Sequence, residues 1–314
     1  TFGGSLWLVR LPYAVPVNTL GTKVGAAYTH SHVGADVGVG VGGITGGGDA
    51  DIGRLFVLHP FIRSRELSVY GQAGFDIKNF DNDFQSQPQS QPQHDNLRVF
   101  SIGSYVDFVD RLRGANTGSL TLWQGIGNFL GGMDGINDPT ASVPGAGGTF
   151  TKLTGEISRS QLITTYTSIF LRVGGQWAST SLVVPEQYIV GGQGTVRGYP
   201  VAQFSCDRGY SLTGEFRWNA PGFADKAAFL GKKWGDIFQC YAFIDHGGAN
   251  LIHPQEGQTK SQTITGAGVG AQLALPDNFV LKLEYAKPMN NVVGGATPSN
   301  GLNNYVYFLA VKWF

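Results

Sequence analysis

Apolar residues stand at every second position along most of this chain, and this period of two constrains the fold more than any other feature. Residues 210–219 show it most clearly, because apolar residues alternate there with serine, threonine, glutamate and arginine. Residues 67–78 and 279–287 repeat the pattern. Side chains two positions apart share one face of a strand but not of a helix. The chain is therefore predicted to consist of β-strands with one apolar and one polar face.

About thirteen segments carry this alternation, and most have the roughly 9–11 residues that a tilted strand needs to cross a bilayer. They are residues 5–15, 20–32, 53–62, 67–78, 96–108, 117–127, 149–158, 162–177, 209–219, 236–247, 262–275, 279–287 and 303–314. Their polar faces carry Gln72, Lys78, Glu215, Arg217, Gln272, Lys282 and Glu284. We predict an all-β fold, a transmembrane antiparallel β-barrel whose polar faces line a hydrated lumen.

The connections between these segments alternate in length. Short turns are predicted at residues 16–19, 63–66, 159–161 and 276–278, and long polar connections at 33–52, 79–95, 128–148, 178–208, 248–261 and 288–302. Outer-membrane barrels have short periplasmic turns and long extracellular loops. One turn, residues 220–235, is longer than this pattern allows, and residues 227–234 within it are predicted to form a short surface helix.

The composition excludes several other classes of protein. Lysine plus arginine and aspartate plus glutamate are both 22, and a net charge of zero argues against a nucleic-acid binder. Only 14% of residues are charged, where a soluble domain has about 25%. A soluble sandwich or propeller would also alternate, but the loops alternate in length and no ~40-residue repeat is present. A lipid-facing barrel therefore remains the better prediction, and no apolar run is long enough for a spanning helix.

No group of residues predicts an enzyme, a metal site or a cofactor. His30 and His32 share one strand face, as a metal pair would, but a third ligand is missing. They are interpreted as surface or lumen histidines. The glycine-rich residues 38–48 lack the lysine and the helix of a phosphate loop and are interpreted as a flexible extracellular loop.

The two cysteines, Cys206 and Cys240, predict no disulfide framework because they lack CxxC spacing. Antiparallel pairing extended from residues 219 and 236 puts Cys206 opposite about residue 249. The two thiols are then far beyond disulfide reach.

One segment of the longest connection, residues 178–208, has a distinctive sequence. A lone arginine lies there among glycines, in the run Val196-Arg197-Gly198-Tyr199. By itself this run indicates only an exposed turn. It resembles the VRGY/F signature of the polypeptide-transporting outer-membrane barrels, which include barrel-assembly insertases and two-partner secretion (TpsB) transporters. In that superfamily the signature tips a loop that folds back into the lumen and pairs with an acidic residue.

The acidic motif of the superfamily, written F/G-x-D-x-G, resembles the run from Phe243 through Asp245 to Gly247. The resemblance therefore implies that Arg197 pairs with Asp245, and Glu215 is a second possible partner. A loop anchored in this way is either a plug that gates the pore or a brace for barrel assembly, and the two roles are compatible. Arginine suits either role because its planar fork binds a carboxylate bidentately.

Other stretches resemble the TpsB branch, namely residues 59–65, 67–72 and 13–16, with Trp313 and Phe314 as the C-terminal assembly signal. The family barrel has sixteen strands, with the signature loop between the eleventh and the twelfth. Eight predicted segments precede the loop here and five follow it. The resemblance implies a single barrel domain over residues 1–314 that starts at the fourth strand, with three strands and the N-terminal POTRA domains outside this chain. The turn at residues 16–19 independently indicates a preceding strand.

The implied function is an outer-membrane pore that secretes a large exoprotein client, an adhesin or haemolysin, by two-partner secretion. Its other expected partners are outer-membrane lipid and, during biogenesis, the barrel assembly machinery, and neither nucleic acid nor a cofactor is expected. A barrel-assembly insertase of the same superfamily is one alternative. A passive porin without a protein client is the alternative from another class.

Overall fold

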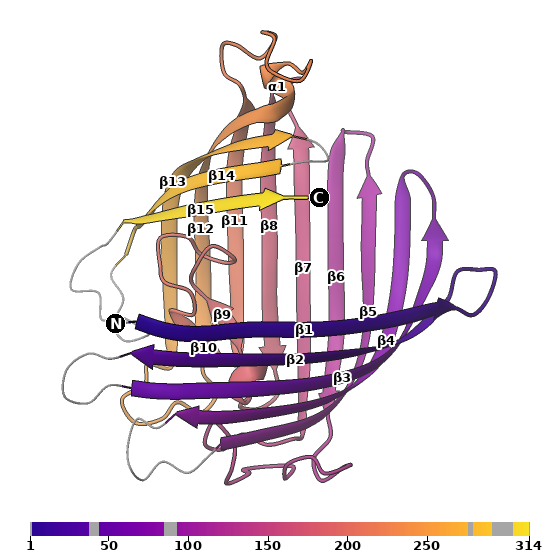
Figure 1. Ribbon diagram of the computed structural model, residues 1–314, viewed down its shortest axis with the longest axis vertical. Helices are drawn as coiled ribbons and strands as arrows, with labels where there is room; N and C mark the ends of the chain where they lie inside the picture. Colours follow the sequence, from indigo (N-terminus) through magenta and orange to yellow (C-terminus); the bar gives the residue numbers. More distant parts are fainter. Residues whose placement is uncertain (1, 38–43, 85–92, 276–278, 291–303, 314) are drawn as a thin grey trace. The chain divides into compact units, whose positions relative to one another are not determined.

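The computed structural model describes residues 2–37, 44–84, 93–275, 279–290 and 304–313. Within them, thirteen strands form one antiparallel sheet in which every strand pairs with its neighbours in chain order (Figure 1). The strands are β1 (Phe2–Pro16), β2 (Lys23–Val37), β3 (Ile44–Arg63), β4 (Leu67–Phe84), β5 (Gln93–Val109), β6 (Gly114–Gly125), β7 (Phe150–Leu162), β8 (Thr167–Ala178), β11 (Arg208–Asn219), β12 (Phe238–Asn250), β13 (Ser261–Leu275), β14 (Phe279–Pro288) and β15 (Tyr305–Lys312). The predicted antiparallel strand order is confirmed, with eight strands before residues 178–208 and five after them.

Several predicted strand ends are wrong. Residues 33–37 and 44–52 were expected in a loop, but they extend β2 and β3, and Val33 pairs with Gly48. Glycine-rich backbone can form ladder hydrogen bonds without showing any apolar alternation, so the sequence pattern missed these ends. The turn expected at residues 159–161 lies inside β7, and the chain reverses at residues 163–166 instead. The expected turn at 276–278 and part of the expected loop at 38–48 lie outside the described residues.

The short helix predicted at residues 227–234 is also wrong. These residues form a tight turn closed by a bridge between Ala227 and Lys233, and the only α-helix of the described chain is α1 (Trp234–Ile237). Leu230 and Gly231 have φ angles of 57° and 69°, in the left-handed region. A right-handed helix cannot continue through two such residues. No helix in the described part of the chain is both long enough and apolar enough to cross a membrane.

The connection between β8 and β11 contains three short elements of its own. The 3₁₀ helix η1 (Val184–Glu186) is followed by β9 (Tyr188–Val190) and β10 (Phe204–Cys206), which pair as a separate two-stranded sheet. We call residues 179–207 the anchored loop. The long polar connection predicted here is therefore ordered by its own hydrogen bonds.

The chain divides into two compact units. The first comprises Thr1–Val106, Ser119–Thr154 and Trp177–Gln187, and the second comprises Asp107–Gly118, Gly155–Gln176 and Tyr188–Phe314. In the first unit the apolar side chain of Ile102 is exposed while Asp76 is buried, and in the second Phe216 is exposed while Glu215 is buried. The predicted alternation is confirmed, and each unit has an exposed apolar face and a polar face with buried charged side chains.

Candidate functional site

The tip of the anchored loop packs on the polar face of the second unit through a small apolar core. Val190, Val196, Tyr199 and Cys206 of the loop pack there with Ala249 of β12 and Ile264 of β13. Residues 191–203 leave and return to this core because β9 and β10 pair, with Val190 opposite Phe204. Burial of these apolar side chains fixes the intervening residues, among them Arg197, against the sheet.

Arg197 makes a bidentate ion pair with Asp245 of β12. Its Nε lies 2.7 Å from Asp245 Oδ2, and its Nη2 lies 2.9 Å from Asp245 Oδ1. The backbone N–H of Arg197 also donates to Asp245 Oδ2, at 3.1 Å. Both side chains are buried, with exposed fractions of 4% and 1%. The structure thus brings together the two residues that the motifs associate, and every polar atom of the carboxylate faces a donor of the loop.

Two further carboxylates form ion pairs with the same guanidinium. Arg197 Nη1 lies 2.8 Å from Glu215 Oε1 of β11 and 2.6 Å from Glu284 Oε1 of β14. Both glutamates are buried. Arg217 and Lys282 pair with Glu215 and Glu284 at 2.7 and 3.1 Å. Three cations therefore balance three carboxylates, and we call these six residues the Arg197 cluster.

The Arg197 guanidinium is also stacked and fully ionised. Its Cζ lies 3.5 Å from the centre of the Phe243 ring, a distance at which cation and ring attract each other. Burial opposes the charge, but the hydrogen bonds and charges of Asp245, Glu284 and Glu215 outweigh burial and raise the pKa of Arg197 above its ordinary value. Phe243, the first residue of the acidic motif, is therefore a packing surface for the cation.

Glycines allow the loop backbone to approach the sheet this closely. Gly198 has a φ angle of 93°, which residues with a Cβ rarely adopt. A Cβ on Gly247 would lie 2.8 Å from Val196 Cγ2, and a Cβ on Gly266 of β13 would overlap the carbonyl oxygen of Arg197. The motif glycines Gly198 and Gly247 thus have steric roles, and Gly266 has the same role without belonging to a motif.

Two tyrosines hold the loop beyond Arg197. Tyr307 of β15 accepts a hydrogen bond from the Gly198 N–H at 3.1 Å and donates to the Tyr199 carbonyl at 3.2 Å. The Tyr199 hydroxyl lies 3.0 Å from the Thr265 carbonyl and 2.9 Å from the Asn290 carbonyl. The loop tip is therefore bound to β12, β13 and β15 through separate side chains.

Sequence reasoning missed three residues of this site. Glu284 was assigned only to a polar strand face, because an isolated acid in an alternating strand resembles a solvated one. Tyr307 carried no signal beyond its place in the alternating segment 303–314, although its hydroxyl bonds the loop. Gly266 carried no signal beyond its place in the glycine-rich run of β13.

The remaining predicted residues are the assembly signal and the histidine pair. Trp313 follows β15 and is 52% exposed, and its proposed partner in the assembly signal, Phe314, lies outside the described residues. His30 and His32 each lie 2.7 Å from an aspartate, Asp51 and Asp49 respectively. Among the residues that the structure describes, no group of three or more histidine, cysteine or acidic side chains could hold a metal ion.

The predicted register around the cysteines is wrong. Asn219 pairs with Gln239, three positions from the assumed partner, and Cys206 pairs with Tyr188 inside the loop. The chain between Asn219 and Gln239 forms the turn and α1, which takes up the extra residues. Cys206 and Cys240 are both free thiols.

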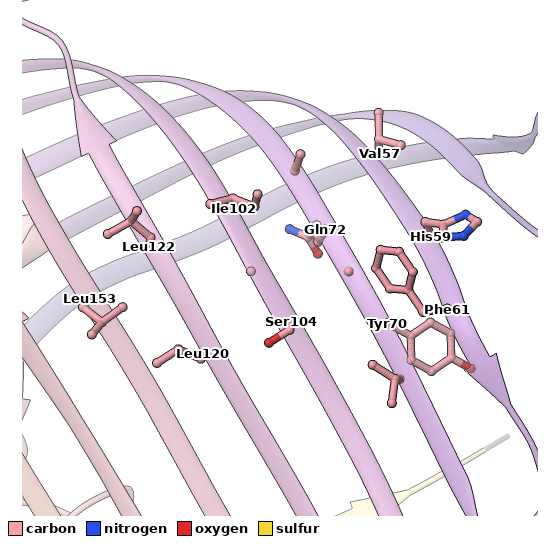
Figure 2. A pocket seen from close by; sticks show the side chains of 14 residues that line it. Val57, His59, Phe61, Tyr70, Gln72, Ile102, Ser104, Leu120, Leu122 and Leu153 are labelled. Carbon is pink, nitrogen blue, oxygen red and sulfur yellow. The ribbon is translucent and has the colours of Figure 1, made fainter.

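The exposed apolar face of the first unit carries a groove of about 610 Å³. Figure 2 shows its lining, with Phe61 and Val57 of β3 on one side and Leu120 and Leu122 of β6 on the other. Gly71, Ala73 and Gly103 add little side-chain volume between these walls. The rest of the lining is mostly apolar, and its polar residues are His59, Tyr70, Gln72 and Ser104.

Comparison with known proteins identifies the family of this chain. The family model described as haemolysin secretion/activation protein ShlB/FhaC/HecB matches residues 63–273. The heme/hemopexin transporter protein HuxB of Haemophilus influenzae is 21% identical over 293 residues, which cover 91% of this chain and 49% of HuxB. The chain thus spans about half the length of the curated relatives it matches.

Solved structures share the fold. CdiB from Escherichia coli is 19% identical with a TM-score of 0.72, over 98% of this chain and 53% of that chain. BamA from Haemophilus ducreyi lacking POTRA domains 1–3 is 14% identical with a TM-score of 0.65, over 98% of this chain and 62% of that chain. The fold is that of the transmembrane antiparallel β-barrels of the bacterial outer membrane. The chain belongs to the haemolysin secretion/activation protein ShlB/FhaC/HecB family.

Proposed function

We propose that this chain is the translocating part of an outer-membrane pore that secretes a large exoprotein, of the adhesin or haemolysin type, by two-partner secretion. The observation that carries the proposal is the buried attachment of the anchored loop to the polar face through Arg197 and Asp245. The family match supports the same function. Transport of this kind is not catalysis, and no cofactor is expected for it.

The polar strand faces suit the passage of an unfolded polypeptide. Such a chain must keep its backbone groups hydrated or paired, because each unsatisfied group costs several kcal/mol in an apolar medium. Glu215, Asp245 and Glu284 lie on the face that the loop covers. A pore lined in this way must also be closed at rest, or solutes leak. The loop, seated on this face, provides the closure.

The Arg197 cluster both holds the loop in its closing position and binds the loop to several strands of the sheet. When Arg197 is in place, its cluster is neutral, with three cations and three carboxylates. Moving the loop away leaves Asp245, Glu215 and Glu284 with only two cations on the sheet. A client must supply favourable contacts that offset this loss, so the resting state is stable until a client binds.

The chain forms one barrel domain that is completed by strands and POTRA domains outside it. Two observations support this proposal. Among the described strands, β1 pairs only with β2 and β15 only with β14, so each leaves one edge unpaired. An unpaired edge is unfavourable in lipid. The relatives are also about twice as long. The exposed apolar residues face lipid, and Trp313 and Phe314 serve as the signal for the barrel assembly machinery.

Secretion of an exoprotein is the direct test of the function. The intact protein is expressed with the exoprotein encoded by a neighbouring gene, and that exoprotein is measured in the medium. We expect secretion with the parent protein and with the exposed control variant Arg65→Ala, and its loss with Arg197→Ala. A protein that assembles in the outer membrane, secretes no exoprotein and conducts small solutes freely would be a porin.

The barrel-assembly insertase remains the second candidate because the BamA likeness covers 98% of this chain. It predicts a different readout. Depletion of the intact protein would lower the amounts of other outer-membrane proteins. Under the secretion proposal their amounts stay unchanged, and only the exoprotein disappears from the medium.

A further inference from the structure

A second buried ion cluster holds the other end of the anchored loop, within the first unit. Glu186, the last residue of η1, is only 3% exposed. Its Oε1 lies 2.6 Å from Lys78 Nζ of β4, and its Oε2 bonds Lys152 Nζ of β7. Lys152 Nζ also donates to the Glu186 backbone carbonyl at 3.2 Å. One loop residue is therefore bound to two strands of the sheet through both carboxylate oxygens and its main chain.

An aromatic ring and an aspartate organise the cations around Glu186. The Trp123 ring centre lies 5.2 Å from Lys78 Nζ, 5.6 Å from Lys152 Nζ and 5.8 Å from Arg54 Cζ. Asp76, also buried, lies 3.8 Å from Lys78 Nζ and 3.3 Å from Arg54 Nε. These cations attract the ring and Asp76, but Asp76 alone balances only one of the three.

Glu186 reduces an excess of positive charge on the strands. Arg54, Lys78 and Lys152 are three cations, and Asp76 is the one strand carboxylate that pairs with them among the residues the structure describes. Glu186 supplies the second carboxylate. Removing it leaves three clustered cations with one acid in a region shielded from water, which is strongly unfavourable.

We propose that Glu186 is a positioning residue that fastens the first limb of the anchored loop, with a polarity opposite to that of Arg197. The loop offers an anion to cations at Glu186 and a cation to anions at Arg197. Clearing the loop from the pore then requires the opening of both clusters. The proposal rests on the proposed function only where it assigns this release to transport. The attachment itself is testable without a client.

Cys206 is a native reporter of the attachment. Tyr188 follows Glu186 by two residues, and its carbonyl accepts from Cys206 Sγ at 3.3 Å. The thiol is fully buried in the loop core. Burial raises the pKa of the Cys206 thiol to about 12, so at neutral pH it reacts only when the loop opens. If Glu186 detaches from the lysines, the adjoining residues Gln187 and Tyr188 are freer to move. We expect the contact between Tyr188 and Cys206 to open and the thiol to become exposed.

The test measures alkylation of Cys206 by a small maleimide in isolated outer membranes that contain the intact protein with Cys240→Ser. Glu186→Gln removes the negative charge and keeps the shape of the side chain. We expect it to speed alkylation by about tenfold, the size of a modest shift in a local opening equilibrium. Glu256→Gln, which removes one charge from an exposed loop residue, is the control and leaves the rate unchanged. Parent-like alkylation of Glu186→Gln would overturn the proposal.

Two milder variants keep the proposal testable if Glu186→Gln fails to assemble. Lys78→Gln leaves Lys152 in place, and we expect roughly a threefold increase in the alkylation rate. Glu186→Asp keeps the charge on a side chain one methylene shorter, and we expect its rate to lie nearer the parent than that of Lys78→Gln. The proposal would be overturned if Lys78→Gln reacted at the parent rate. It would also be overturned if Glu186→Asp reacted faster than Lys78→Gln.

The same variants separate this inference from the proposed function. Faster alkylation of Glu186→Gln supports the anchor even in a protein that secretes no exoprotein, and that outcome would count against the secretion proposal alone. Unchanged alkylation in a protein that secretes normally would count against the anchor alone.

Discussion

The two ends of the anchored loop are held by chemically opposite devices. At Glu186 the sheet offers two lysines, which are point charges on flexible stems, to one carboxylate. At Arg197 the sheet offers three carboxylates and an aromatic ring to one planar guanidinium. Bidentate contact with Asp245 requires the planar guanidinium of arginine, and the close approach of the loop requires the glycines around it. A lysine ammonium on a flexible stem can meet a carboxylate in many geometries. The contact at Arg197 is therefore marked by a sequence motif, and the contact at Glu186 is not.

Removing the arginine is expected to produce the largest effect of any single change. Arg197→Ala leaves Asp245, Glu215 and Glu284 buried with only Arg217 and Lys282 to balance them. Breaking a buried pair in this way costs about 3–5 kcal/mol. Urea unfolding of the purified protein, followed by the heat-dependent shift of its band on a gel, measures the loss.

The matched control for this loss is Arg65→Ala, which removes an arginine from an exposed turn and is expected to leave unfolding unchanged. Equal losses for the two variants would mean that the buried cluster contributes nothing beyond an ordinary surface charge. The Arg197 end could then no longer be regarded as the more strongly held end of the loop.

A lysine at the same position tests the fork rather than the charge. Arg197→Lys keeps a cation near Asp245 but cannot contact that carboxylate, Glu215 and Glu284 together. We expect it to recover secretion and stability only in part, with a remaining loss of roughly 1–3 kcal/mol. Full recovery would show that the site at Arg197 needs only a point charge, as the site at Glu186 does.

The family resemblance associated Arg197 with Asp245 because both lie in local motifs, and the structure brings these two side chains into contact. The sequence also predicted the strands, since alternation is a property of neighbouring residues. It could not predict Glu186 as an anchor, because its partner Lys78 is 108 positions away and no local pattern marks either residue. Gly266 was missed for a similar reason: its role is set by the carbonyl of Arg197, on a separate segment.

The close approach of the loop to β13 is tested by adding a single methyl group. The Cβ of Gly266→Ala would overlap the Arg197 carbonyl oxygen, whereas that of Gly214→Ala on β11 would meet Ile244 and Leu171 at 3.7 and 3.8 Å, an ordinary contact. We expect Gly266→Ala to cost about 1–3 kcal/mol and Gly214→Ala much less. Urea unfolding of both variants measures the difference, and equal stabilities would contradict the packing described for the loop.

Acid is expected to weaken the attachment of the anchored loop at Glu186. Burial disfavours the charge of Glu186, but Lys78 and Lys152 outweigh burial and hold its pKa below the usual 4.5. A carboxylate with a lowered pKa stabilises the fold above its unfolded pKa and loses that contribution as pH falls through the folded value. The attachment should therefore stay constant from neutral pH down to about 4.5 and weaken below it.

A disulfide reagent that reacts in acid, such as 4,4′-dithiodipyridine, measures exposure of Cys206 across this range in the Cys240→Ser background. The ratio of parent to Glu186→Gln rates is expected to be flat above pH 4.5 and to approach one below it. A ratio that already changes between pH 8 and pH 6 would show that some other group controls the loop.

The most direct test of the account is a double-mutant cycle between Arg197 and Asp245. Arg197→Ala, Asp245→Ala and the double variant are compared by urea unfolding and by secretion of the exoprotein. Because the two side chains belong to one neutral buried cluster, each single change leaves that cluster with an unbalanced charge, and the second change restores the balance. We predict a double variant less damaged than the sum of the single losses, by about 1–3 kcal/mol. Fully additive losses would contradict the claim that this ion pair anchors the loop.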